Sequence, residues 1–343
     1  MKCFLSADFL NADKELVYKD IGLSRLDEAG IQHSFLEEPQ PEVTADQLQG
    51  ADTIISLTPK FNAASFSGIE DHFLAVVRFG VGYDMVDVDA CTEAGVALFI
   101  TRGAVNHSVS EAIITWMLAL SHRLKEKDQL VREGRWEERG NYMGNELNGR
   151  TLGLVGAGGI GSHLAQVLKG FGMKEILAFD PYLQADVAAE RGMRLVDLHT
   201  LMESSDYVSV NCPLTDETRD LIGAEQLELM PSDAYLINTA RGGIVNEAAL
   251  FSALKEGRIA GAATDVFENE PADGSHPFAQ LDNILLAPHC FAWTDELFAR
   301  IGHMAADAVV QLSRGTVPEE LLVNPDVLKT DRFQEKLKNH LSS

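Results

Sequence analysis

A short apolar run leads directly into a glycine-rich turn in the stretch Thr151-Leu152-Gly153-Leu154-Val155-Gly156-Ala157-Gly158-Gly159-Ile160-Gly161. The run predicts a β-strand, and the segment Ile160–Phe171 predicts the helix that follows it. The turn fits the pattern G-x-G-x-x-G, in which glycines allow a close backbone approach to a pyrophosphate at a helix N-terminus. We therefore predict a dinucleotide site whose contacts are Gly156, Gly158, Gly159, Ile160 and Gly161.

An acidic residue stands where such a site needs one. Asp180 ends the next predicted strand and lies 180 − 161 = 19 residues past the last glycine of the turn, where a carboxylate accepts hydrogen bonds from an adenosine ribose. It would repel a 2′-phosphate, and the residues Pro181, Tyr182 and Leu183 supply no arginine to bind one. We expect NAD rather than NADP. The alternative is an ordinary strand–helix turn with a surface aspartate.

The same alternation of strand and helix continues through the middle of the chain. Strands are predicted at Thr151–Gly156, Glu175–Asp180, Tyr207–Cys212, Ala234–Thr239, Ile259–Val266 and Asn283–Pro288. Helices are predicted at Ile160–Phe171, Ala185–Gly192, Ala224–Leu229 and Glu247–Glu256, the last with Asn246 as N-cap and Gly257 as its end. Because several strands are almost wholly apolar, we expect an open parallel sheet covered by helices on both faces.

A weaker version of this alternation occupies the first third of the chain. Strands are predicted at Lys2–Leu5, Gln32–Leu36, Thr53–Leu57, Leu74–Arg78 and Val96–Ile100, and helices at Lys14–Gly30 and Thr44–Leu48. One long helix from about Ser108 to Gly134 should enter the middle domain, and the helix Asp295–Leu312 should return to the first, followed by a polar tail. The prediction is an α/β protein with two doubly wound domains, one comprising residues 105–289 and the other, discontinuous, comprising 1–104 with 290–343.

Composition limits the classes of partner. Two domains suit 343 residues, and 45% hydrophobic with 23% charged residues is ordinary for a globular protein. The 52 acidic and 28 basic residues give a net charge of −24, which disfavours nucleic acid and anionic membranes as partners. No apolar stretch is long enough for a membrane span, and an early Asp8 interrupts any signal peptide, so we expect a cytoplasmic protein. The four cysteines lie far apart without metal-ligand spacing, so no metal is expected.

Three chemically complementary side chains follow predicted strands of the middle domain: Arg241, Glu270 and His289. An arginine binds a carboxylate through two parallel hydrogen bonds. A histidine exchanges a proton with a carbonyl or hydroxyl oxygen near neutral pH, and a glutamate bonded to it favours the imidazolium. Each residue alone could be a surface or turn residue, but their occurrence together with the glycine turn predicts a catalytic set. A nucleophilic role for Cys290 is disfavoured, because only His289 could stabilise its thiolate.

These segments together resemble the D-isomer-specific 2-hydroxyacid dehydrogenase family. The resemblance rests on Gly156–Gly161, Asn238–Val245, Asp265–Pro271 and Pro288-His289, with two further segments at Arg78–Asp84 and Asn211–Thr215. It covers nearly the whole chain in the family's order. It implies a Rossmann NAD domain inserted into a flavodoxin-like substrate domain, with the active site in the cleft between them. The activity it implies is hydride transfer between NAD(H) and a 2-oxo or D-2-hydroxy acid.

The resemblance also implies roles for individual residues. Arg241 would bind the substrate carboxylate, His289 would protonate the carbonyl oxygen, and Glu270 would orient His289. The Gly80-Val81-Gly82 loop would offer backbone N–H groups to the carboxylate. Contacts with the cofactor are implied for Thr101, Cys212, Pro213, Ala240 and Asp265, the last beside the nicotinamide carboxamide.

Some positions depart from the family pattern or leave alternatives open. Phe291 and Trp293 are bulky where many relatives have small residues, and Trp293 and Lys60 are candidate substrate contacts, as are Tyr142 and Met143 in their loop. They indicate a substrate other than plain glyoxylate. The family has glutamine in place of Glu270 in formate dehydrogenases, which argues against that activity, and the segment after the last helix leaves no room for a regulatory domain. A non-enzymatic NAD(H)-sensing protein, like the corepressors of this fold, is the alternative function. A homodimer through the NAD domain is expected, with the helical segment Glu111–His122 at its interface.

Overall fold

The computed structural model describes residues 1–342 and divides the chain into two compact units. The first unit comprises Met1–Val105 together with Trp293–Ser343, and the second comprises Asn106–Ala292. The chain passes between the units close to the two predicted boundaries, after residues 104 and 289.

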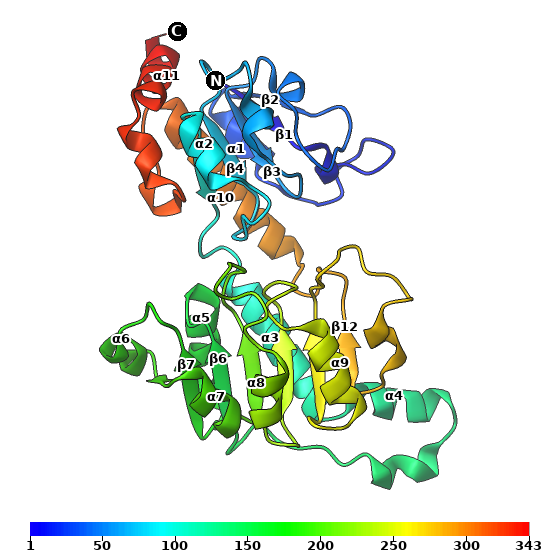
Figure 1. Ribbon diagram of the computed structural model, residues 1–343. Helices are drawn as coiled ribbons and strands as arrows, with labels where there is room; N and C mark the ends of the chain where they lie inside the picture. Colours follow the sequence, from blue (N-terminus) through cyan, green and yellow to red (C-terminus); the bar gives the residue numbers. More distant parts are fainter. Residues whose placement is uncertain (343) are drawn as a thin grey trace. The chain divides into compact units, whose positions relative to one another are not determined.

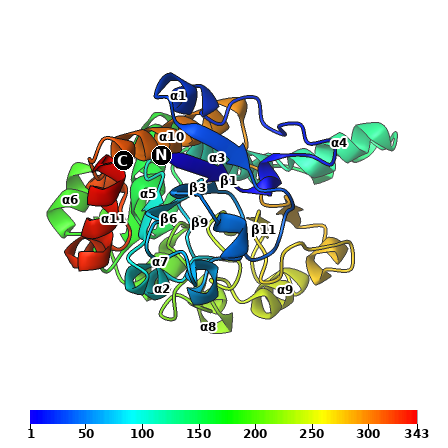
Figure 2. The ribbon, with the colours of Figure 1, turned by 90° about the horizontal axis from the view of Figure 1, so that it is seen from above.

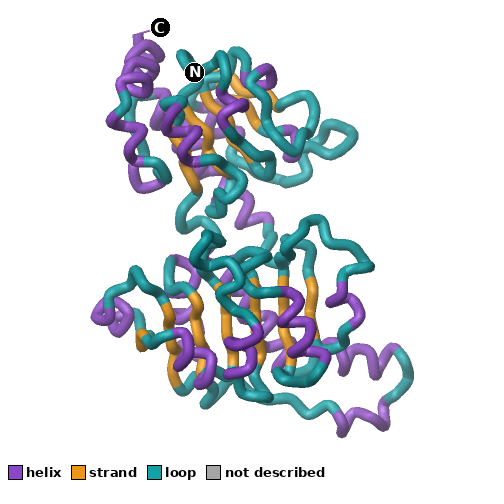
Figure 3. Tube along the Cα trace, in the orientation of Figure 1, coloured by secondary structure: helices purple, strands orange, loops and turns teal. Residues whose placement is uncertain are grey.

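The first unit contains five parallel strands (Figure 3). They are β1 (Lys2–Leu5), β2 (Gln32–Phe35), β3 (Thr53–Ser56), β4 (Ala75–Arg78) and β5 (Ala97–Ile100). Their order in the sheet is β2-β1-β3-β4-β5. This is the flavodoxin-like doubly wound order, with its switch point between β1 and β3, and it confirms the fold expected for this part of the chain.

Helices cover both faces of this sheet. On one face lie α1 (Leu23–Glu28) and α10 (Asp295–Ser313), which pack against each other (Figure 2). On the other face lies α2 (Val88–Glu93), whose Cys91 packs with Ile54, Val76 and Leu98 of the strands in one buried cluster. Thr294 caps α10 by accepting a hydrogen bond from the Leu297 N–H at 3.0 Å. This N-cap stabilises the first turn of the helix.

The second unit contains seven parallel strands (Figure 1). They are β6 (Thr151–Val155), β7 (Glu175–Phe179), β8 (Arg194–Leu195), β9 (Tyr207–Val210), β10 (Tyr235–Asn238), β11 (Gly261–Thr264) and β12 (Ile284–Leu286). The order β12-β11-β10-β9-β6-β7-β8 is the Rossmann order with one added strand. Its switch point lies between β6 and β9, and the glycine turn leaves the sheet at the end of β6.

A buried core lies on each face of the seven-stranded sheet, between the strands and the helices that cover them. One face packs against α3 (Asn106–Ser121) and α5 (Gly159–Val167), and the other against α7 (Leu198–Ser204), α8 (Ala224–Leu229) and α9 (Glu247–Lys255). Along β10 the side chains alternate, Leu236 toward the second core and Ile237 toward the first. Asn246 caps α9 by accepting the Ala249 N–H at 2.9 Å, as predicted.

Three predicted helices are wrong in extent. The segment Lys14–Gly30 is helical only in α1, because Lys14 and Gly22 take positive φ angles of 63° and 85° that a right-handed helix excludes. The segment Thr44–Leu48 forms only a 3₁₀ turn. The long helix Ser108–Gly134 is two helices, α3 and α4 (Leu124–Arg132), because Arg123 has a φ of 51° between them.

The polar tail predicted after α10 includes a helix that was not predicted, α11 (Asp331–Ser342). The pattern missed three further short elements, α2, α7 and β8. The remaining elements are α6 (Ala185–Glu190) and the 3₁₀ turns η1 (Ala7–Phe9), η2 (Asp46–Leu48), η3 (Ala63–Phe66), η4 (Trp136–Asn141), η5 (Leu168–Phe171), η6 (Pro277–Gln280), η7 (Glu319–Leu321) and η8 (Pro325–Lys329).

A buried lysine fastens α11 to the first unit. Lys336 is only 4% exposed, and its Nζ donates hydrogen bonds to the carbonyl oxygens of Phe73 at 2.7 Å and Ala94 at 3.1 Å. Burial lowers the pKa of Lys336 to about 7, and the charge of Arg332 acts in the same direction. A neutral amine has two N–H hydrogens and so matches two acceptors, whereas an ammonium has a third.

Stability of the first unit should therefore rise with pH above 7. In the unfolded chain Lys336 keeps its ordinary pKa, so between pH 7 and about 10.4 the unfolded state binds more protons than the folded state. The free energy of unfolding, measured with urea, should increase relative to that of Lys336→Met by at most about 1.4 kcal/mol per pH unit in this window. The exposed Lys329→Met is the matched control and should show no such difference. A pH-independent difference for Lys336→Met would contradict this account.

Candidate active site

The predicted residues of the second unit converge on one edge of its sheet. The strands β12, β11, β10, β9, β6 and β7 are consecutive neighbours and parallel. Their carboxyl ends therefore meet at one edge, the edge at which ligands bind to open α/β sheets. In that order these ends are followed by His289, Asp265, Arg241, Cys212, Gly156 and Asp180.

The glycine turn after β6 contains three glycines that packing requires and one that it does not. A Cβ on Gly156 would lie 2.6 Å from the Cys212 backbone nitrogen, and one on Gly161 would lie 2.6 Å from the Gly156 oxygen. A Cβ on Gly159 would collide with the side chain of Asn106 at 2.8 Å. A Cβ on Gly158 would meet no atom of the described chain within 4 Å. Packing thus explains the other three glycines, whereas Gly158 leaves room for a ligand to approach the backbone.

This turn fits a dinucleotide pyrophosphate. Gly158 is the N-cap of α5, so the first N–H groups of the helix, from Gly159 on, have no acceptor within the helix and face the turn. Asp180 supports the turn because its Oδ2 accepts the Ala157 N–H at 2.9 Å, while its Oδ1 accepts the Tyr182 N–H at 3.0 Å. The carboxylate is thereby held at the end of β7 beside the glycine turn.

The loop after β9 borders the same turn. The Asn211 N–H donates to the Val155 oxygen at 2.7 Å, which places Cys212 next to Gly156. Pro213 continues the loop, and its oxygen accepts the Thr218 hydroxyl at 2.6 Å. Burial raises the pKa of Cys212 to about 11, so this cysteine is a neutral thiol that packs beside the turn.

A buried asparagine that the sequence analysis missed shapes the turn of Arg241. Asn238, the last residue of β10, accepts the Ala240 N–H at 3.0 Å and donates to the Arg241 oxygen at 2.9 Å. The Arg241 side chain itself donates to the Ala240 oxygen at 2.8 Å. An asparagine at a strand end that bridges its own turn is a common device, and its position three residues before Arg241 was the available signal.

Backbone contact joins this turn to the one that leads to Glu270. A Cβ on Gly242 would lie only 1.9 Å from the Phe267 oxygen, so the two segments touch where Gly242 has no side chain. The Phe267 N–H in turn donates to Glu270 Oε1 at 3.0 Å. The arginine turn and the glutamate therefore hold each other in place.

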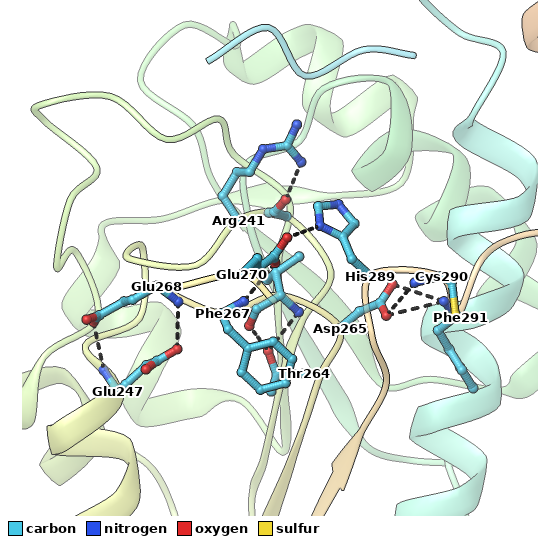
Figure 4. Close-up of polar contacts among 12 residues, drawn as sticks. Arg241, Glu247, Thr264, Asp265, Phe267, Glu268, Glu270, His289, Cys290 and Phe291 are labelled. Atoms are coloured by element: carbon cyan, nitrogen blue, oxygen red, sulfur yellow. Dashed lines mark hydrogen bonds and ion pairs between the residues drawn. The ribbon is translucent and has the colours of Figure 1, made fainter. Parts of the chain in front are cut away.

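His289 and Glu270 form a direct pair. His289 Nδ1 lies 2.7 Å from Glu270 Oε2, and Arg241 extends on the same side of the glutamate (Figure 4). Burial by itself raises the pKa of Glu270, but the hydrogen bond and charge of His289, the Phe267 amide and the charge of Arg241 lower it overall. The carboxylate is thus ionised at neutral pH. Since Nδ1 faces Glu270, a proton exchanged with a substrate has to pass through Nε2.

Asp265 fixes the turn that contains His289 through backbone and side-chain hydrogen bonds. Its backbone oxygen accepts the His289 N–H at 2.8 Å, and its carboxylate accepts the N–H groups of Cys290 at 3.0 Å and Phe291 at 3.1 Å. His289 has a φ of 54°, a conformation that histidine adopts more readily than most residues. Burial raises the pKa of Asp265, while the Phe291 amide and the charge of His289 oppose that shift.

The other predicted contacts belong to the first unit. Gly80, Val81 and Gly82 follow β4, Thr101 follows β5 and is fully buried, and Lys60 is exposed after β3. The Gly80 loop is fixed on both sides, since the Phe79 N–H donates to Ser56 O at 2.7 Å and the Thr101 N–H to Gly80 O at 2.9 Å.

The bulky residues after His289 separate into two environments. Phe291 stacks on Trp116 of α3 with ring centroids 4.2 Å apart, so it fills a core gap. Trp293 is 49% exposed and packs edge-on against Tyr18 and Phe298 of the first unit. Burial and the charge of Asp265 raise the pKa of Cys290, which disfavours a thiolate there, as the sequence predicts.

Residues 1–342 contain neither a cluster of metal-ligating side chains nor a helix that could cross a membrane. No group of three or more His, Cys, Asp or Glu side chains in this part of the chain could hold a metal ion. No helix within it combines the length and apolarity needed to cross a membrane.

Comparison with known proteins identifies the relatives of this chain. Residues 114–290 match the family model of the D-isomer specific 2-hydroxyacid dehydrogenase NAD binding domain. The chain is 38% identical over 314 residues to a glyoxylate reductase of Korarchaeum cryptofilum, covering 90% of this chain and 94% of that protein. It is 39% identical over 257 residues to a D-3-phosphoglycerate dehydrogenase of Archaeoglobus fulgidus, covering 75% of this chain and 48% of that protein.

A solved structure has the same fold over most of the chain. It is the D-lactate dehydrogenase of Aquifex aeolicus complexed with NAD and lactic acid, with a TM-score of 0.81, 26% identity and coverage of 94% of this chain and 98% of that one. The parallel sheets, the glycine turn and these likenesses define an oxidoreductase with a Rossmann-type NAD domain. The chain belongs to the D-isomer-specific 2-hydroxyacid dehydrogenase family, whose cofactor is NAD.

Substitutions in the glycine turn should separate cofactor binding from folding. Because Gly158 has a negative φ of −65° and open space around its Cβ position, Gly158→Ala should leave the melting temperature unchanged. It should weaken NADH binding by about tenfold or more, since the methyl group occupies the path of the pyrophosphate. Gly161→Ala is the control for packing and should lower the melting temperature as well. Unchanged NADH affinity of Gly158→Ala, measured by fluorescence titration, would contradict this assignment.

Proposed function

We propose that the protein reduces a 2-oxo acid to the D-2-hydroxy acid, and catalyses the reverse oxidation, with Arg241, Glu270 and His289 as its catalytic set. The observation that carries the proposal is the 2.7 Å pair of His289 Nδ1 and Glu270 Oε2 at the sheet edge where the NAD turn also ends. A bound NADH supplies the hydride for this chemistry. Each protein group then has one task.

Arg241 binds the substrate carboxylate and polarises the neighbouring carbonyl. Its guanidinium presents parallel N–H donors. The turn from which it extends is fixed by the hydrogen bond of the Asn238 side chain to the Arg241 oxygen and by the backbone contact of Gly242 with Phe267. The positive charge is compensated by the ionised Glu270 nearby, as the lowered pKa of that carboxylate reflects. Arg241 is therefore not an uncompensated charge while the substrate is absent.

His289 would donate a proton from Nε2 to the carbonyl oxygen of the substrate during its reduction. Glu270 holds Nδ1–H and favours the imidazolium, so the donor is charged and correctly turned before the substrate arrives. In the oxidative direction the neutral imidazole takes the hydroxyl proton back. Asp265 positions the histidine backbone throughout, in addition to the contact with the nicotinamide carboxamide that we propose for it.

The remaining contacts are assigned to two ligands. For the cofactor they are Gly156, Gly158, Gly159, Ile160, Gly161, Asp180, Cys212, Pro213, Ala240 and Thr101. For the substrate they are the loop Gly80-Val81-Gly82, through the backbone N–H groups of Val81 and Gly82, with Lys60 and Trp293 toward its far end. The Gly80 N–H donates to the Arg78 oxygen at 2.9 Å and so shapes this loop. Asp180 supports a preference for NADH over NADPH, because a 2′-phosphate would meet its carboxylate. Location in the cytoplasm stays a prediction from sequence.

The direct test is turnover of NADH with a panel of 2-oxo acids, glyoxylate included, and of NAD with D- and L-2-hydroxy acids. We expect turnover of at least one 2-oxo acid and selectivity for the D isomer. His289→Ala should lower kcat by roughly 10²–10⁴-fold and leave NADH binding unchanged, because the histidine supplies only the proton. Near-full activity of His289→Ala would remove this residue from the mechanism. NADH binding without any turnover would favour the NAD(H)-sensing alternative.

Glu270→Gln separates orientation from charge. The amide keeps the shape of the side chain but no longer favours an imidazolium, so the reductive rate should decline at a lower pH than in the wild type. The expected measurement is kcat/KM for the oxo acid against pH. A uniform loss of activity at every pH would mean that Glu270 acts only through geometry.

We also propose a homodimer through the second unit, with an interface that differs from the predicted segment Glu111–His122. The predicted segment Glu111–His122 is largely buried within this unit, where Ile113 and Met117 belong to its core. By contrast, Leu124, Val131, Trp136 and Met143 in and after α4 are exposed by 60% to 78%. Large exposed apolar side chains gathered in one segment favour a protein interface. Light scattering should give twice 37.5 kDa, and a monomer mass would refute the dimer.

A further inference from the structure

A second histidine–glutamate pair lies at the end of the loop that carries Glu270. His276 Nε2 is 3.1 Å from Glu247 Oε2, and both side chains are largely buried, with 17% and 19% of their surface exposed. Glu247 is the first residue of α9, directly after the N-cap Asn246. This pair has no task in the proposed mechanism, although a buried carboxylate is kept only where the protein satisfies it.

Both ring nitrogens of His276 are already used by the protein. Nδ1 accepts the Phe278 N–H at 3.3 Å, so Nε2 carries the hydrogen that is donated to Glu247. The ring also lies edge-on to Phe267 and Phe278, at centroid distances of 5.1 and 4.8 Å. A histidine that is bonded at both nitrogens has none left for a ligand, in contrast to His289. The pair therefore suits holding a loop in place rather than proton transfer.

The second oxygen of Glu247 holds the other end of the same loop. Glu247 Oε1 accepts the Glu268 N–H at 2.8 Å, and the Glu247 N–H donates to Glu268 Oε1 at 3.4 Å (Figure 4). One carboxylate thus bonds residues 268 and 276, which stand on either side of Glu270 in the chain. The two hydrogen bonds fasten both ends of the loop to the start of α9.

The loop between these two hydrogen bonds is exposed from residue 268 to residue 275. Its own hydrogen bonds are local, since Asp273 accepts the N–H groups of Ser275 and His276. The Glu270 carboxylate accepts the Phe267 N–H at 3.0 Å, and the next N–H along the chain, that of Glu268, donates to Glu247. A shift of residue 268 would therefore also move the donor that holds Glu270.

We propose that Glu247 is a positioning residue for the proposed reaction, because by fixing residues 268 and 276 it keeps Glu270 on His289 Nδ1. The inference rests on the proposed function, in which Glu270 orients His289. Glu247 acts only through the loop, and His276 is its second point of attachment. The effect can be large, since a misplacement of about 1 Å in a catalytic contact can lower the rate by about 10²-fold.

The first test removes the carboxylate of Glu247. Glu247→Ala should lower kcat for 2-oxo acids by about 10–100-fold with little change in KM. Because a displaced Glu270 favours the imidazolium of His289 less, the reductive kcat/KM should also decline at a lower pH than in the wild type. Glu247→Gln keeps an oxygen that can accept the Glu268 N–H and should recover part of the loss. Glu225→Ala, at an exposed glutamate in the first turn of α8, is the matched control and should change neither quantity.

A double-mutant cycle tests whether Glu247 acts through Glu270. In a Glu270→Ala background the position of the loop no longer affects His289, so the further change Glu247→Ala should lower kcat by less than about threefold. The same loss in both backgrounds would mean that Glu247 serves the fold in general and would overturn the inference. A wild-type kcat and pH profile in Glu247→Ala would overturn it as well.

Hydrogen–deuterium exchange tests the attachment of the loop without turnover. The Glu268 amide should exchange at least about tenfold faster in Glu247→Ala than in the wild type, whereas the amides of the buried strand β11 should exchange as before. Unchanged exchange at Glu268 would contradict the proposed attachment. Faster exchange in a protein whose wild type turns over no 2-oxo acid would refute the proposed function and not the attachment of the loop to α9.

Discussion

A buried carboxylate, Asp265, fixes the turn that contains His289, the residue proposed to be catalytic. Asp265 ends β11 and binds the backbone N–H groups that follow His289, while its own carbonyl binds the histidine N–H. Without these bonds the positive φ of His289 would have no support, and the imidazole would lose its direction toward Glu270. The conformation of His289, the residue proposed to transfer the proton, thus depends on Asp265.

The parallel arrangement of the strands then determines which side chains meet. In an antiparallel sheet the residues after successive strands would alternate between two edges, whereas here six consecutive strands end at the same one. A glycine turn, a carboxylate, an arginine and a histidine distant in sequence therefore border a single region. The first unit repeats the principle at the carboxyl ends of β3, β4 and β5, with serine, arginine and threonine.

Much of this could be predicted from sequence, and the failures have physical reasons. Buried parallel strands are short continuous apolar runs, so those of both sheets were found within a residue or two, except for the two-residue β8. The periodicity of apolar residues gives no information about the backbone angle of a single residue. The positive φ of Arg123 therefore divides one predicted helix into two without any signal in the pattern. The helix α11 was missed because its most informative buried residue, Lys336, is a lysine. Asn238 and Gly242 were recognisable only as parts of a motif, since their roles depend on contacts between segments.

The contact between Gly242 and Phe267 limits how the arginine turn and the glutamate turn can evolve. Two backbones that touch cannot be lengthened or displaced separately, so an insertion in either loop would have to be matched by a change in the other. Under the proposed function, substrate choice can then change more easily in the loops of the five-stranded sheet than in this pair. A protein engineer seeking a new specificity would find the adaptable positions there.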